Sequence, residues 1–151
     1  MQLNKEQIIE YQKNRPPYLM MDFITEVIPG KSARGYKYLD KKEWFFKCHF
    51  PGDPSMPGML QVEAIVQLTA MALFTLEGNK GKVAYITKLK DASFIKKVLP
   101  NSKLELEGDI LSFKRGIANC KGVAKVNEKI VCKATFNLVL PHIMEEFKIK
   151  E

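Results

Sequence analysis

The feature that most constrains this chain of 151 residues is a long apolar segment that holds a single charged side chain. The segment runs from Pro57 to Leu76, contains no Lys, Arg or Asp, and carries Glu63 as its only charge. A helix that is apolar on nearly every side is typically a buried helix. Pro57 suits the first turn of a helix, and Gly78 suits its end. The sequence therefore predicts a fold built around one long central helix.

Glu63 and the loop before the helix indicate proton-transfer chemistry. Burial disfavours an unpaired carboxylate, which usually responds by raising its pKa and keeping its proton. Glu63 is thus predicted to be a proton donor near neutral pH, and an ion-paired or capping carboxylate is the alternative. The loop from Lys47 to Pro57 holds three prolines, Gly52 and His49, and a stiff segment of this kind suits the placing of a side chain. His49 is the candidate base, and a structural or exposed histidine is the alternative.

Composition limits the class of protein. A chain of this length is expected to form one domain, covering residues 1–151. Its amino-terminal sequence shows no signal peptide, which favours a cytoplasmic protein. A membrane span is disfavoured because Gln61, Glu63 and Gln67 interrupt the apolar segment and no Lys or Arg stands at its immediate ends. The cysteines are too widely spaced to indicate a disulfide framework or a zinc site, and they are Cys48, Cys120 and Cys132.

The net charge is +7, carried by scattered lysines with local pairs at Lys96-Lys97 and Lys114-Arg115. A basic surface of this kind favours either simple solvation or an acidic partner. Nucleic acid fits poorly, because no nucleic-acid-binding motif accompanies the charge. With only two histidines, His49 and His142, a histidine-based metal site is not expected. His142, next to Pro141, is predicted to lie at the surface.

The remaining pattern predicts an α+β fold with an antiparallel sheet. Before the central helix we expect a short helix over Lys5 to Gln12 and strands over Tyr18 to Ile28 and Ala33 to Leu39. After it, the period of two predicts strands over Lys82 to Lys90, Ala92 to Val98, Lys103 to Phe113, Ile117 to Val126 and Lys129 to Leu140. Strands that are segregated from a helix favour a sheet wrapped around that helix. A second copy of the chain would cover the remaining open side, so we expect a dimer.

At this point one segment resembles a known family. The sequence HFPGDPSMPGMLQVEAIVQ, from His49 to Gln67, is similar to the signature of the hot-dog-fold 3-hydroxyacyl-acyl carrier protein dehydratases of fatty acid synthesis. That family joins a His-Phe-Pro loop, through Met-Pro-Gly, to a central helix with Glu-Ala-x-x-Gln. The segment from Arg15 to Asp22 resembles the family's Arg-Tyr-Pro-Phe-Leu-Leu-Val-Asp stretch, and the later strands show a weaker likeness. The resemblance implies a dimeric hot-dog fold.

The chain departs from the family pattern at several positions. Asn14 stands where the family usually has a histidine that is not the catalytic one, and Pro100-Asn101-Ser102 replaces a Pro-Gly-Asp turn. Cys48 before His49 resembles the related branch that also isomerises its product, but that branch has Asp at the position of Glu63. These mixed features leave the acyl chain length, the product and any isomerase activity open.

The resemblance implies a specific division of work. His49 would take the proton next to the thioester carbonyl, and Glu63 would protonate the departing hydroxyl. The backbone N–H of Gly58, at the helix start, would stabilise the oxyanion. Gln67, one turn after Glu63, would orient the carboxyl group or satisfy nearby backbone. His49 and Glu63 of one site would come from different subunits, and the reaction needs no cofactor.

The resemblance also names a partner, an acidic acyl carrier protein that bears the 3-hydroxyacyl chain. Candidates for the docking surface are the four basic residues Lys96, Lys97, Lys114 and Arg115. Alternative functions are a hot-dog thioesterase, an acyl-coenzyme A hydratase and a catalytically silent dehydratase-like subunit. Cys48 is not expected to be a catalytic nucleophile paired with His49, because adjacent side chains in an extended segment point to opposite sides.

Overall fold

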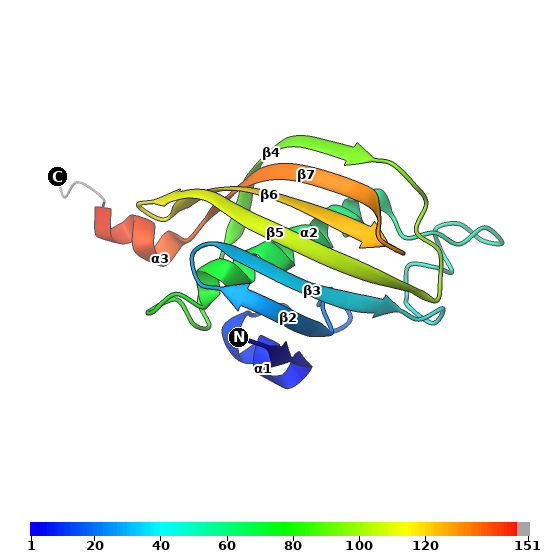
Figure 1. The fold of residues 1–151 in the computed structure, drawn as a ribbon, viewed down its shortest axis with the longest axis horizontal. Helices are drawn as coiled ribbons and strands as arrows, with labels where there is room; N and C mark the ends of the chain where they lie inside the picture. Colours follow the sequence, from blue (N-terminus) through cyan, green and yellow to red (C-terminus); the bar gives the residue numbers. More distant parts are fainter. Residues whose placement is uncertain (148–151) are drawn as a thin grey trace.

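A computed structural model describes residues 1–147, and it shows one long helix, α2, lying across one face of a seven-stranded antiparallel sheet (Figure 1). The strand order across the sheet is β1-β2-β3-β5-β6-β7-β4. The elements are β1 Leu3–Asn4, α1 Lys5–Tyr11, β2 Phe23–Ile28, β3 Ser32–Leu39, α2 Gly58–Phe74, β4 Tyr85–Phe94, β5 Ser102–Lys114, β6 Ile117–Val126, β7 Lys129–Val139, α3 Pro141–Met144 and the 3₁₀ turn η1 Glu145–Phe147. This is the hot-dog fold that the sequence predicts.

The central helix is buried as its composition predicts. Every residue of α2 from Ala64 to Phe74 is buried. The sheet approaches the helix closely because Gly108 on β5 and Gly122 on β6 pair with each other beneath it. A Cβ atom on Gly108 would overlap Thr69 Oγ1 of α2, so only glycine allows this approach.

Two strand predictions are wrong. The predicted strand over Tyr18 to Ile28 begins only at Phe23, because the backbone before it pairs with a helix side chain instead of a neighbouring strand. The backbone N–H of Met20 donates to Gln67 Oε1 at 2.8 Å. The separate strands over Lys82 to Lys90 and Ala92 to Val98 are one strand, β4, which begins at Tyr85 and continues through two register shifts against β7.

The carboxyl-terminal end differs from the prediction for His142. This histidine lies on the short helix α3, and its Nε2 is 2.9 Å from Asn79 Oδ1. Asn79 is buried and donates from Nδ2 to the carbonyl of Leu73 near the end of α2. His142 is therefore partly buried against the end of the central helix, and its surface assignment is wrong.

Strand β4 leaves the sheet with an apolar, unpaired edge. Its large side chains are unusually exposed for their type, including Tyr85 at 59%, Ile86, Leu89 and Phe94. Met59, on the nearby first turn of α2, is 60% exposed. An exposed edge with apolar side chains is typical of a surface that another chain covers. Within residues 1–147, no helix is long and apolar enough to span a membrane.

Candidate active site

Glu63 lies on the one side of α2 that the sheet leaves partly open. The side chain is half-buried, and it accepts a hydrogen bond at Oε1 from Gln67 Nε2 at 2.9 Å. Burial raises the pKa of Glu63 above its ordinary value, and the hydrogen bond from Gln67 opposes this rise with a smaller effect. The structure thus agrees with a carboxyl group that holds its proton more tightly than a solvated one.

Gln67 is held in place by the backbone of the segment before β2. Its Nε2 donates to the carbonyl of Tyr18 at 3.0 Å, and its Oε1 accepts from the N–H of Met20. The second N–H of the same amide reaches Glu63. One side chain therefore contacts both the backbone and the carboxyl group, so orientation of Glu63 by Gln67 stays a prediction that these contacts allow.

His49 has one ring nitrogen fixed and one available. Its Nδ1 is 3.0 Å from the carbonyl oxygen of Ser55. Since a carbonyl only accepts, Nδ1 carries the proton and Nε2 keeps the lone pair that a base needs. The loop is held by further backbone bonds, from the N–H of Ser55 to the carbonyl of His49 and from the N–H of Met56 to the carbonyl of Val98.

Gly58 is the first residue of α2, and no side chain among the described residues caps this helix start. The first N–H groups of a helix have no partner within it, and they favour negative charge nearby. The ring of Phe94 packs over Gly58, since a Cβ placed there would be 2.7 Å from Phe94 Cδ1. Glycine is therefore required by packing at the position that the resemblance assigns to the oxyanion donor.

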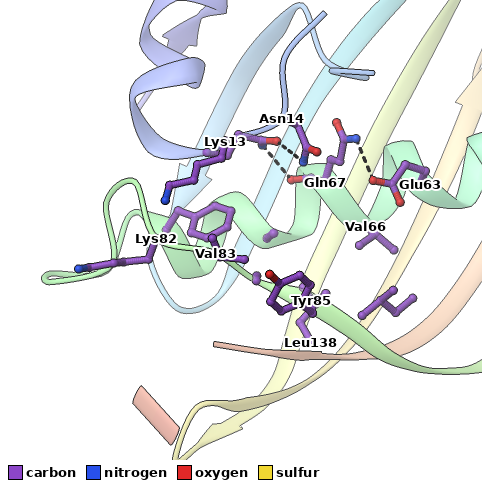
Figure 2. Close-up of a pocket in the computed structure, with 14 residues that line it drawn as sticks. Lys13, Asn14, Glu63, Val66, Gln67, Lys82, Val83, Tyr85 and Leu138 are labelled. Atoms are coloured by element: carbon purple, nitrogen blue, oxygen red, sulfur yellow. Dashed lines mark hydrogen bonds between the residues drawn. The ribbon is translucent and has the colours of Figure 1, made fainter. Parts of the chain in front are cut away.

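Two cavities border Glu63, and each has a volume of about 310 Å³. The first, the inner cavity, lies between the middle of α2 and the start of β4 (Figure 2), and its helix residues are Glu63, Val66, Gln67, Ala70 and Phe74. The second, the edge cavity, opens across the exposed strand β4 beside Met59 and Leu89. His49 lines neither cavity. Within residues 1–147 of a single chain, neither of these two cavities joins His49 to Glu63.

Sequence reasoning missed the contribution of the segment that follows α1. Asn14 and the buried Gln12 line the inner cavity, and Asn14 Nδ2 donates to Gln12 Oε1 at 3.0 Å. Burial and the charge of Glu63 both raise the pKa of Tyr18, which places that phenol close to the carboxyl group. The departure from the family pattern at Asn14 was the only signal of this role in the sequence.

The two predicted basic pairs lie at opposite ends of the sheet. The backbone N–H of Lys96 points to the carbonyl of Val131, whereas Lys114 pairs with Ile117, which faces Val139. The stretch of β7 between Val131 and Val139 is about 27 Å long at ~3.3 Å per residue. The two pairs therefore do not form one surface on a single chain.

Lys97 differs from the other candidates because it contacts the His49 loop. Its Nζ is 3.3 Å from Asp53 Oδ2, and both side chains are exposed. Such an exposed ion pair is worth at most about 1 kcal/mol. An acidic partner therefore competes with Asp53 for this lysine at little energetic cost.

The cysteines and possible metal ligands add no further site. Cys48 is exposed, and its Sγ lies 3.5 Å from the carbonyls of Trp44 and Phe45. Burial raises the pKa of Cys120 to about 12 and that of Cys132 to about 11. In the described part of the chain, no three His, Cys, Asp or Glu side chains are grouped so as to hold a metal ion.

The fold is that of a hot-dog protein, with a half-buried carboxyl group on its central helix. Comparison with known proteins places the chain in a family with this fold. The model of the FabA-like domain family matches residues 13–135, so the chain belongs to this family. The 3-hydroxyacyl-[acyl-carrier-protein] dehydratase FabZ of Bacillus velezensis is 44% identical over 91% of this chain and 98% of its own length. The FabZ proteins of Bacillus subtilis and Clostridium novyi are 41% and 42% identical, over 91% and 90% of this chain and 98% and 97% of their own lengths.

Solved structures support the fold alone, because their sequences are distant. The dehydratase heterocomplex ApeI:P from Xenorhabdus doucetiae superposes with a TM-score of 0.74 at 11% identity, covering 93% of this chain and 97% of that chain. A hypothetical thioesterase with coenzyme A from Streptococcus pneumoniae gives a TM-score of 0.61 at 14% identity, covering 78% and 83% of the two chains. The same fold is thus shared by a dehydratase heterocomplex and a hypothetical thioesterase.

Proposed function

We propose that this protein dehydrates 3-hydroxyacyl thioesters, carried on an acyl carrier protein, to trans-2-enoyl thioesters. The observation that carries the proposal is the half-buried Glu63 carboxyl, whose pKa burial raises and whose Oε1 is held by Gln67. Because Oε1 accepts from Gln67, the acidic proton resides on Oε2 and faces the reacting group. The FabZ relatives named above support this substrate class for the chain.

The reaction uses groups that the fold already holds. His49 Nε2 removes a proton from the carbon next to the thioester carbonyl, and negative charge develops on the carbonyl oxygen. The N–H of Gly58 donates to that oxygen at the helix start. Glu63 then gives its proton to the 3-hydroxyl group, which leaves as water while the carbon–carbon double bond forms. Transfer of the proton from His49 back to Glu63, through solvent, restores both groups, and no cofactor takes part.

The proposal includes a homodimer, or an assembly of dimers, in which His49 of one chain serves Glu63 of the second copy. Two observations support it. His49 lines neither of the two cavities that border Glu63, as expected if a second chain supplies the base. The apolar edge of β4 and the exposed Met59 lie next to the edge cavity, which is where a second chain would bring its residues.

The proposed partner is acidic and approaches the end of the sheet that carries Lys96 and Lys97. Lys97 touches the loop of His49, so a carrier protein bound there stands close to the base. Lys114 and Arg115 lie at the other end of the sheet and are the weaker candidates. A cytoplasmic location belongs to the same proposal, in keeping with a water-soluble carrier protein as partner.

The decisive experiment offers the purified protein matched 3-hydroxyacyl thioesters on carrier protein and on coenzyme A, and identifies the products by mass spectrometry. A trans-2-enoyl thioester formed faster on carrier protein supports the proposal. Release of free 3-hydroxy acid with the thiol would identify a thioesterase, and preference for coenzyme A would identify a hydratase. No turnover of any substrate by folded protein would identify a silent subunit.

A further inference from the structure

The inner cavity has two chemically different ends. Glu63 stands at one end, and the walls beyond it are apolar, formed by Val66, Ala70 and Phe74 of α2 and by Leu138 of β7. The lining also includes the exposed side chains of Lys13 and Lys82, which Figure 2 shows on the side of the cavity away from Glu63, whereas Asn14 stands next to Gln67. The charged end of the cavity therefore differs in chemistry from its apolar walls.

The two lysines have no competing partner. Neither Lys13 nor Lys82 forms an ion pair with any carboxylate among residues 1–147, whereas the nearby Lys80 is paired with Glu10 at 3.3 Å. They approach the cavity from different segments, one after α1 and the other in the loop before β4. Two exposed cations without a carboxylate partner among the described residues form an end that suits an anion.

The position of Glu63 fixes how a substrate occupies this cavity. Under the proposed function, the 3-hydroxyl carbon lies at Glu63, so the rest of the acyl chain has to leave through a cavity that begins there. Both cavities border strand β4, at Tyr85 and Ile86 for the inner cavity and from Ile86 to Leu89 for the edge cavity. The inner cavity adds the buried side chains of Ala70 and Phe74 of α2 and of Leu138, whereas the edge cavity lies beside the exposed Met59. The apolar tail is better shielded from water in the inner cavity, and its end then reaches Lys13 and Lys82.

We propose that the inner cavity selects 3-hydroxyacyl chains whose far end carries a carboxylate, with Lys13 and Lys82 as the specificity-determining end. This inference rests on the proposed dehydratase function and adds the substrate class. Methylene groups of the tail contact Val66, Ala70 and Phe74, and the terminal carboxylate pairs with the two lysines. The cations stay near the surface, so the tail's charge keeps part of its hydration and avoids the cost of full burial.

The test compares pairs of 3-hydroxyacyl thioesters of equal length, one ending in methyl and one in carboxylate, from short through medium to long chains. At the length that spans the cavity, the carboxylate substrate is expected to have a Michaelis constant lower by about fivefold, the upper range for an exposed ion pair. The preference is expected to shrink as salt is raised. The double variant Lys13→Gln/Lys82→Gln should remove the difference between the two substrates of each pair.

Lys129→Gln, at the exposed first residue of β7, is the matched control, and it should keep the preference. If methyl substrates are dehydrated and no length shows a preference for carboxylate, the inference is overturned while the dehydratase function stands. A preference that survives in the double variant overturns it as well. If no thioester of either kind is dehydrated, the proposed function itself fails, so the two failures are distinguishable.

Discussion

Gln67 Nε2 lies 2.9 Å from Glu63 Oε1, one turn apart on the same helix, and the same amide nitrogen lies 3.0 Å from the carbonyl of Tyr18. The carboxyl group that defines the site is therefore tied to the irregular segment before β2. This link joins three parts of the sequence, because Gln67 also accepts from the backbone of Met20. A helix side chain thus sets both the packing of that segment and the direction of the acid.

The first prediction concerns the proposed acid and base. His49→Ala and Glu63→Gln should each reduce kcat by ~10²–10⁴-fold, the usual contribution of a general acid or base. Steady-state dehydration of a 3-hydroxyacyl thioester measures the loss, and circular dichroism checks that the variants are folded. Near-normal turnover in either folded variant would refute the assignment.

A mixed-dimer experiment extends this prediction to the subunit arrangement. His49→Ala and Glu63→Gln chains, unfolded together and refolded, should regain about a quarter of the wild-type activity if each site takes its base and acid from different copies, because half of the dimers are mixed and each mixed dimer has one intact site. Each variant refolded alone is the control. No recovery in the mixture would place both groups of a site on one chain.

Gln67→Met should alter both stability and the pH profile. Removing the amide leaves the buried N–H of Met20 without its acceptor, which costs about 1–3 kcal/mol of unfolding free energy. The hydrogen bond to Glu63 lowers the pKa of that carboxyl, so its loss should move the alkaline limb of the kcat profile to higher pH. Chemical denaturation and pH–rate curves measure the two effects. A stability loss with an unmoved pH profile would reduce Gln67 to a packing role.

Much of this fold was predictable because local pattern and burial agree. The helix over Gly58–Phe74 follows from a long apolar segment bounded by Pro57 and Gly78, and the strands β3, β5, β6 and β7 follow from a period of two along the chain. Strand β4 was misjudged because Lys90 and Asp91 resemble a turn, yet Asp91 pairs with Thr135 in the ladder. The charged pair is tolerated there because β4 lies at the sheet edge, where side chains face water.

The parts of the site that escaped prediction depend on contacts between distant segments. Nothing near His142 in the sequence indicates Asn79 as its partner. The Nδ2 of Asn79 donates to the carbonyl of Leu73 at the end of α2, and its Oδ1 then needs a hydrogen-bond donor, which His142 Nε2 supplies. The bonds from Gln67 to Tyr18 and Met20 span more than forty residues of chain. Local periodicity carries no information on such pairs, whereas His49 and Glu63 were found because each departs from the pattern around it.

Stability should depend on pH through Glu63. A pKa raised in the folded state means that the native protein binds the proton more tightly than the unfolded chain does. The stabilisation from this group is therefore complete below the unfolded pKa of ~4.3 and is lost as pH rises through the higher folded value. Glu63→Gln, which has no proton to lose, should become progressively more stable than wild type across that window. Thermal melts at fixed protein concentration measure the difference, and a difference constant with pH would contradict the raised pKa.

The apolar edge of β4 is predicted to form the interface between the two chains of the dimer. Leu89→Asp places a charge on this edge, where Leu89 is 38% exposed in the single chain, and should shift the protein to monomers with little activity. Ile28→Asp is the matched control, because Ile28 is 41% exposed but lies on β2, far across the sheet. Sedimentation velocity measures both variants. A dimeric Leu89→Asp protein, or an active wild-type monomer, would show that the edge is not the interface.

The last prediction concerns docking of the carrier protein. Charge reversal at Lys96 and Lys97 together should raise the Michaelis constant for the carrier-protein substrate, because opposite charge steers association. The wild-type constant should also rise with salt, since the Debye length is ~8 Å at physiological ionic strength. Lys97→Glu places a negative charge beside Asp53 in the His49 loop. Turnover of a small uncharged thioester is therefore the control that the loop is intact, and it should not change. Reversal at Lys114 and Arg115, at the other end of the sheet, should have the smaller effect. If the carrier-protein reaction is indifferent to salt and to reversal at Lys96 and Lys97, this end of the sheet is not the docking surface, and the positive charge serves solubility or another partner.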